Sequence, residues 1–71
     1  KHMTANEALD QYLKSLESKE RAIKSRDIRY LCQKTSSVLY DWKKGRTPIP
    51  GVYRDKIIEA VGINIFENVA N

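Results

Sequence analysis

Hydrophobic residues near the start of the chain recur at the three- and four-residue spacing of a helix. They define one face of a helix, formed by Ala5, Leu9, Tyr12, Leu13 and Leu16. Thr4 and Glu7 are spaced as a capping box, in which the threonine hydroxyl accepts an early backbone N–H and the glutamate reaches back. The polar, poorly periodic stretch 17–21 breaks the pattern. We therefore expect a first helix from residue 5 that ends in this stretch.

A second, shorter helix is expected in the middle of the chain. Ile23 would anchor the connection before it. Ser25 can act as its N-cap, with Asp27 in the first turn, where the helix dipole favours an acidic side chain. The inward face would consist of Ile28, Leu31 and Cys32, and the residues Gln33 and Lys34 would form the turn that follows.

The stretch TSSVLYDWKKGR predicts a third helix. Thr35 or Ser36 would cap its start, and Gly45 is placed to end it in the left-handed conformation. Its buried face would combine Val38 or Leu39 with Trp42. We expect the tryptophan ring to lie in the core and to brace the end of this helix.

Two prolines, Pro48 and Pro50, exclude a continuous helix through the next segment. A fourth helix is expected from Gly51 to Gly62, with apolar residues at Val52, Tyr53, Ile57, Ile58, Ala60 and Val61. The stretch 64–67 resembles a second capping box and predicts a short fifth helix that includes Val69. The fold class expected is all-α: a compact five-helix bundle forming a single domain over residues 4–71. Residues 1–3 are expected to be a vector-derived remnant plus the start methionine.

Charge is concentrated in the middle of the chain. The 71 residues carry a net charge of +4. Residues 19–46 hold nine lysines and arginines against three acidic residues, a net charge of +6, whereas the segments on either side are slightly acidic. This distribution favours a polyanionic partner, although a solvated basic surface would give the same pattern.

The composition argues against several classes of function. Cys32 is the only cysteine and His2 the only histidine, so neither an internal disulfide nor a Cys/His metal site is expected. We interpret Cys32 as a buried structural thiol. No base is visible that could activate a nucleophile, so we expect neither an enzyme nor a cofactor. Without a membrane-length apolar run or a signal peptide, we expect a soluble, cytoplasmic protein of a bacterial or phage-infected cell.

Three stretches carry a resemblance to a known family. They are IKSRDI, TSSVLYDWKKGRTPIP and IIEAVGINIFENV, which match in turn the start of a second helix, a capped recognition helix with a Trp-x-x-Gly exit, and a fourth helix with a glycine end. Together they resemble the Cro and phage-repressor family (lambda-repressor-like, XRE-type) of helix-turn-helix DNA-binding proteins, over residues 5–70. In such proteins the second helix of the motif enters the DNA major groove. The resemblance implies a sequence-specific regulator of the Cro-like phage or prophage repressor type, bound to double-stranded DNA.

The resemblance also implies which residues contact DNA. Those expected at the major groove are Thr35, Ser36, Ser37, Tyr40 and Asp41, with Lys44 at its rim. Those expected to hold phosphates are Ser25, Arg26, Lys43, Lys44 and Arg46. A homodimer on a near-palindromic operator is expected. Its contact could be supplied by Ile63, Ile65, Phe66 and Val69, or these residues could simply close the core.

The sequence departs from the family pattern at four positions. Arg29 stands where a small residue is usual, and Gln33 and Lys34 stand where the turn usually has glycine and an apolar residue. Asp41 would place a negative charge at the groove, although a carboxylate can accept from cytosine. These departures leave open an alternative: an antirepressor or antitoxin-type module that keeps the fold and binds a partner regulator protein.

Overall fold

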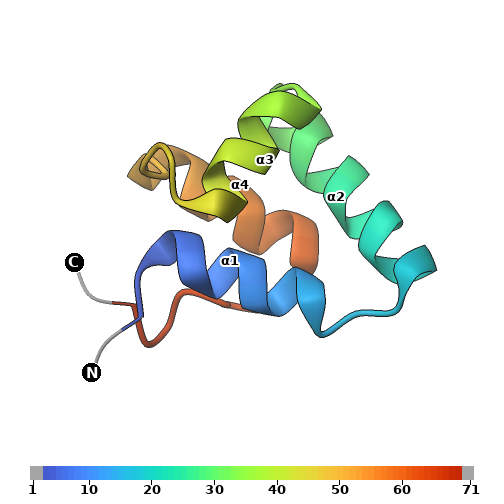
Figure 1. Ribbon diagram of the computed structural model, residues 1–71, viewed down its shortest axis with the longest axis horizontal. Coiled ribbons are helices and arrows are strands. Elements are labelled where there is room, and N and C mark those ends of the chain that lie inside the picture. The colour runs from blue at the N-terminus through green and yellow to red at the C-terminus, as the bar shows by residue number, and fades with distance from the viewer. Residues whose placement is uncertain (1–2, 70–71) are drawn as a thin grey trace.

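The computed structural model describes residues 3–69 and contains four helices in that range (Figure 1). These are α1 (Ala5–Lys14), α2 (Ser18–Cys32), α3 (Ser36–Lys44) and α4 (Gly51–Val61). The expected all-helical class is confirmed, and the expected number of five helices is wrong. Residues 1–2, expected to be vector-derived, lie outside the described range, as do residues 70–71.

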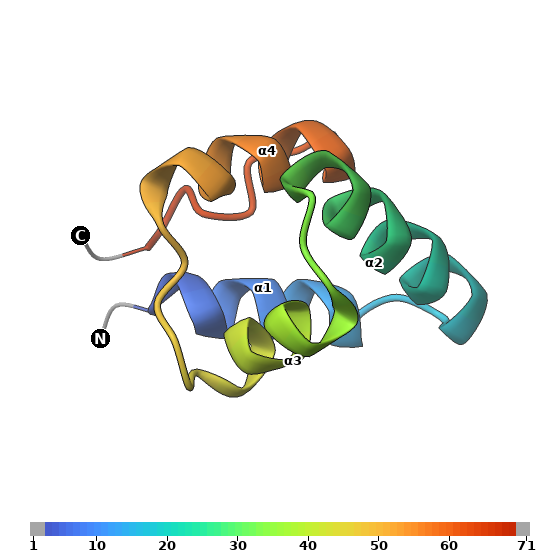
Figure 2. The ribbon, with the colours of Figure 1, turned by 90° about the horizontal axis from the view of Figure 1, so that it is seen from above.

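The helices pack in two pairs. α3 lies against α1, and α4 lies against α2 (Figures 1 and 2). The segment after α4 runs back past α1, so the last described residues lie beside the first. There, Met3 and Val69 form an isolated bridge between their backbones. Because α3 packs on α1 and α4 packs on α2, the outward face of α3 lies away from the outer face of α4.

The second helix begins eight residues earlier than the sequence indicated, with Glu17 rather than Ser25 at the N-cap position. α2 starts at Ser18, so Ser25 lies inside the helix and is not its N-cap, and Ile23 is an exposed helical residue rather than an anchor in a connection. Hydrophobic periodicity gives no signal here because this half of the helix buries little. Its residues Lys19, Glu20, Arg21 and Ala22 are nevertheless good helix formers.

Arg21 connects this part of α2 to the end of α1. Its guanidinium donates to the carbonyls of Leu13, over 2.9 Å, and Leu16, over 2.8 Å. These carbonyls belong to the end of α1 and the residues after it, where the regular helical bonds run out, and the Leu13 carbonyl also accepts the N–H of Leu16. The side chain therefore satisfies the end of one helix and fixes the start of the next.

The expected fifth helix is a turn. Asn64 accepts the backbone N–H of Phe66 through its side-chain oxygen, over 3.0 Å, and the chain then leaves the turn at Val69. Because asparagine bonds to nearby backbone so readily, it offers a turn in place of a helix, and a helix this short has little cooperative stability. Ile65, Phe66 and Val69 pack partly buried against the core.

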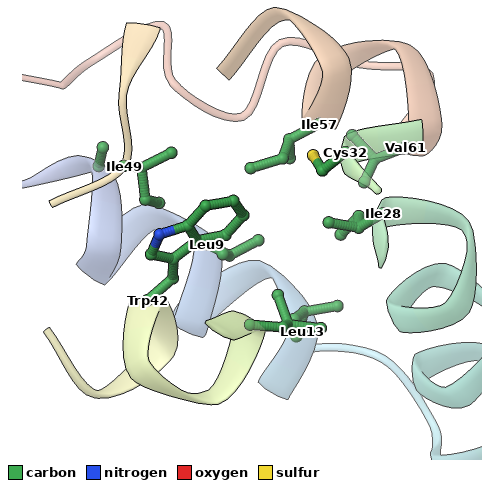
Figure 3. Close-up of a cluster of buried hydrophobic side chains, with 10 residues drawn as sticks. Leu9, Leu13, Ile28, Cys32, Trp42, Ile49, Ile57 and Val61 are labelled. Carbon is green, nitrogen blue, oxygen red and sulfur yellow. The ribbon is translucent and has the colours of Figure 1, made fainter. Parts of the chain in front are cut away.

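The core is built from all four helices and from the extended segment before α4 (Figure 3). Leu39 and Trp42 of α3 are buried, as are Ile28 and Cys32 of α2. The predicted core position of Trp42 is confirmed, with 3% of its surface exposed. Ile49, between the two prolines, is a core residue that the sequence analysis did not identify. The other buried members of this cluster are Ala5, Leu9, Leu13, Ile57 and Val61.

None of the helices within residues 3–69 has the length and apolar character needed to cross a membrane.

Candidate functional site

The turn between α2 and α3 sets the direction of α3. Gln33 adopts the left-handed conformation at φ 54° and ψ 46°. The N–H of Gln33 donates to the carbonyl of Tyr30, and that of Lys34 donates to the carbonyl of Arg29. This pair of bonds is the Schellman motif, usually built around glycine. Gln33 therefore adopts the conformation for which related turns use glycine, at a cost in strain.

Lys34 takes the place of an apolar residue after this turn. Its ammonium lies over the ring of Tyr53, 4.9 Å from the ring centre, and the lysine is half-buried. The Tyr53 ring also packs against Trp42, with 5.6 Å between ring centres. A cation above an aromatic face is attracted to it, while the aliphatic stem covers apolar surface. Lys34 thus packs against the core side of the turn through its stem and its charge.

α3 begins at a capped and exposed end. Thr35 is its N-cap, and the threonine hydroxyl accepts from the N–H of Val38 over 3.4 Å, as expected. Ser36 and Ser37 occupy the first turn, and both are exposed. Their hydroxyls lie beside helix N-terminal N–H groups, which together favour an anionic ligand.

α3 ends in a second Schellman motif, which returns the chain toward the helix. Gly45 is left-handed at φ 75°, as predicted, and the N–H of Arg46 donates to the carbonyl of Asp41 over 2.9 Å. The side chain of Arg46 then folds back along α3. It lies 3.4 Å from the Asp41 carboxylate, and its guanidinium is 5.3 Å from the centre of the Tyr40 ring. The glycine stop therefore adds an arginine to the outer face of the helix.

The outward face of α3 forms a shallow, open depression (α3 in Figure 1). It is lined by Ser36, Ser37, Tyr40, Asp41 and Arg46. Tyr40 is 46% exposed, and Lys44 adds a second cation 5.5 Å from the centre of its ring. Arg46 neutralises Asp41, so Lys44 leaves the surface with a positive balance. The surface combines hydroxyl groups, one aromatic ring and two cations, and these groups suit contacts with phosphates and base edges.

Other expected DNA contacts lie elsewhere. Ser25 is half-buried within α2 instead of at a helix N-terminus. Arg26 is exposed and lies 3.5 Å from the carboxylate of Asp27. Lys43 follows the buried Leu39 by four residues, which places it on the flank of α3 rather than on its outward face.

The hydrophobic residues considered for a dimer contact separate into two groups. Ile65, Phe66 and Val69 pack against the core, in agreement with the simpler of the two interpretations. Ile63 is 59% exposed and remains available to a partner.

Sequence reasoning missed the side chain that holds α3 in place. The amide nitrogen of Asn6 donates to the carbonyls of Trp42 and Thr47, each over 2.8 Å. These bonds join the first turn of α1 to the end of α3 and the loop behind it. Asn6 lies between Thr4 and Glu7, the two residues that form the capping box, and has no part in that motif. No local signal therefore identifies it.

Cys32 behaves as a buried structural thiol. It is 4% exposed, and its sulfur lies 4.0 Å from the carbonyl of Tyr53. Burial raises the pKa of the thiol above its ordinary value, and the positive charges of Lys34 and Lys56 oppose that effect. In the part of the chain that is described, no three His, Cys, Asp or Glu side chains cluster as metal ligands would.

Comparison with known proteins gives no family: no family model, no curated protein and no solved structure matches this chain.

Proposed function

We propose that the protein is a sequence-specific regulator that binds double-stranded DNA and reads the major groove with the outward face of α3. The proposed type is the Cro-like phage or prophage repressor, with α2, the turn at Gln33 and α3 as its helix-turn-helix. The observation that carries the proposal is the exposed surface of α3, where Ser36, Ser37 and Tyr40 lie beside Lys44 and Arg46.

The arrangement of the two helices supports this reading. Ile28 and Cys32 of α2 and Leu39 and Trp42 of α3 are buried together, so the opposite side of α3 is free along its length. An α-helix with its side chains is about 10–12 Å across, which fits a major groove about 12 Å wide. The polar, exposed first turn of α3 would enter first.

Asp41 fits a DNA-binding surface because of its partner. The ion pair with Arg46 lowers the repulsion that an isolated carboxylate would exert on phosphate. On DNA, the arginine can transfer to a phosphate while the carboxylate accepts from a cytosine amino group. The pair would thus contribute to base preference without preventing approach to the duplex.

An amide-shift titration of the isotope-labelled protein with a mixed-sequence duplex tests DNA binding directly. We expect shifts over residues 35–46 that weaken steeply between two salt concentrations, because counterion release makes phosphate contacts salt-dependent. Unperturbed amides at low salt would contradict the proposal.

Sequence reading is tested by a double variant. After selection of a preferred duplex, Ser37→Ala with Tyr40→Ala should reduce the preference for that duplex over random DNA by about tenfold or more. Ser18→Ala, at the end of α2 distant from α3, is the matched control and should leave the preference unchanged (Figure 1). An equal preference in the double variant and the wild type would show that α3 does not read bases.

The alternative of a module that binds a partner regulator rested on Asp41 and on the altered turn. Both features are compatible with DNA binding. Asp41 is paired with Arg46, and Gln33 adopts the left-handed conformation that the turn needs. The titration also separates the two functions, since such a module would bind its protein partner and leave the amides unshifted by DNA.

A further inference from the structure

α4 has an outer face that the rest of the described residues, 3–69, leaves uncovered. Val52 is 64% exposed and Ile63 is 59% exposed, high values for aliphatic side chains. Between them along the chain lie three exposed charged residues, Asp55, Lys56 and Glu59. Val52, Lys56 and Glu59 are four and three residues apart, which places them on one face of the helix. Ile63 follows Glu59 by four residues, just beyond the glycine that ends the helix.

Two of these charges, Lys56 and Glu59, are available to a partner. Within residues 3–69, no ion pair involves Lys56 or Glu59. Their order along the helix, lysine before glutamate, is the less favourable one for a pair on the same helix. The face therefore presents the positive charge of Lys56 and the negative charge of Glu59 between two exposed apolar ends, with the exposed Asp55 at its edge.

This order of residues is complementary to itself. If a second α4 lies antiparallel to the first, with the two-fold axis passing midway between residues 57 and 58, the partners are fixed by sequence position. Val52 then meets Ile63 of the second copy, and Lys56 meets Glu59 of the second copy. A two-fold axis repeats each contact, giving two apolar contacts and two ion pairs.

We propose that the outer face of α4 is the interface of a homodimer, in which α4 packs antiparallel against α4 of a second copy of this chain. The inference does not depend on DNA binding. α4 packs on α2 and α3 packs on α1, so the interface leaves the outward face of α3 uncovered (Figure 2).

The dimer should be weak. α4 has 11 residues and is therefore about 16 Å long. A contact along one short helix falls below the roughly 1,200 Å² typical of stable complexes. We expect association to be concentration-dependent, with dimer detectable by sedimentation equilibrium between about 10 μM and about 1 mM protein.

Charge exchange tests the interface and its register. Lys56→Glu alone places two glutamates opposite each other at both ion-pair positions, and Glu59→Lys alone places two lysines there. Each single variant should weaken self-association by about tenfold or more, since like charges across an interface repel. A one-to-one mixture of the two variants restores opposite charges at both positions. The mixture should associate within about threefold of the wild type.

Matched controls separate this effect from a change in overall charge. Lys19→Glu and Glu67→Lys make the same charge changes at exposed positions outside α4 and should leave association unaltered. Far-ultraviolet circular dichroism on all variants verifies that they fold. A wild type that stays monomeric at about 1 mM overturns the proposal. So do single variants that associate as tightly as the wild type, or a mixture that associates no better than its components.

Discussion

At the scale of single residues, Asn6 connects parts of the chain that are far apart in the sequence. Its amide joins α1 to both the end of α3 and the loop that follows. The carbonyl of Trp42 that accepts one of these bonds also accepts the N–H of Gly45, at the point where α3 stops. The position of the outward face of α3 therefore depends on a polar side chain from the opposite end of the sequence.

Asn6→Asp tests this role with almost no change in shape. The carboxylate cannot donate to either carbonyl, so we expect the free energy of unfolding to fall by about 2 kcal/mol, from two hydrogen bonds of roughly 1 kcal/mol each. A carboxylate in the first turn of α1 is itself favoured by the helix dipole, so the dipole cannot explain a loss of stability. Urea unfolding of the variant and the wild type measures the difference. The two proteins should show the same dependence of the unfolding free energy on urea concentration.

Asn68→Asp is the matched control, because the same substitution there falls on an exposed turn residue. Its free energy of unfolding should stay close to that of the wild type. If Asn6→Asp were as stable as this control, the amide bonds to Trp42 and Thr47 would contribute nothing to holding α3.

At the scale of helices and turns, the Schellman motif after α2 is under conformational strain. Gln33 is the one described non-glycine residue with positive φ, whereas Gly45 and Gly62 serve the equivalent positions after α3 and α4. Gln33→Gly should raise the free energy of unfolding by about 1 kcal/mol, because glycine adopts the left-handed conformation without steric cost. Thermal and urea unfolding both report the change.

Gln11→Gly provides the opposite expectation. Gln11 is exposed and lies inside α1, where glycine costs about 1 kcal/mol relative to good helix formers. A loss of stability in Gln33→Gly comparable to that in Gln11→Gly would show that the turn tolerates glutamine without strain.

The same scale shows how far the sequence predicts the fold. Four local signals at helix starts and ends are confirmed: Thr4 caps α1, Thr35, one of two candidates, caps α3, and Gly45 and Gly62 end α3 and α4. The start of α2 was wrong because hydrophobic periodicity reports burial, and residues 18–24 form a helix while burying little. The fifth helix was wrong because the Asn64 side chain forms a turn with Phe66.

The candidate site divides in a similar way. Burial of Leu39 and Trp42 determines which side of α3 faces outward, so Ser37 and Tyr40 could be selected from the sequence. The return of Arg46 onto Asp41 and the bonds made by Asn6 could not, since both depend on three-dimensional contacts that no local pattern encodes.

At the scale of the whole molecule, Cys32 reports on the opening of the core. A domain of this size has a free energy of unfolding of about 4–11 kcal/mol. Cys32 is buried in a core cluster to which every helix contributes, so a reagent reaches its sulfur only when the core opens. Burial also raises the pKa of the thiol, so the native state keeps it protonated and unreactive.

The pH dependence has a definite sign. Because the folded pKa is raised, the protonated native thiol contributes stability below the ordinary value of 9.0, and that contribution is lost as pH rises beyond it. At pH 8 we expect alkylation of the native protein to be slower than that of the urea-unfolded chain by about a hundredfold or more. Mass spectrometry over a time course measures both rates.

Coupling this measurement to the turn tests whether the molecule opens as one unit. If labelling requires unfolding of the whole domain, Gln33→Gly should slow it about fivefold, the factor that corresponds to about 1 kcal/mol. Cys32 lies beside the turn, so Gln33→Gly alone could change its labelling through a local effect. A second variant, Asn6→Asp, changes a residue at the opposite end of the core. It should accelerate labelling in proportion to its loss of stability. Labelling rates that follow the stability of both variants mean that α1, α2 and α3 unfold cooperatively. Rates that respond to Gln33→Gly alone would contradict this and locate the opening at the end of α2.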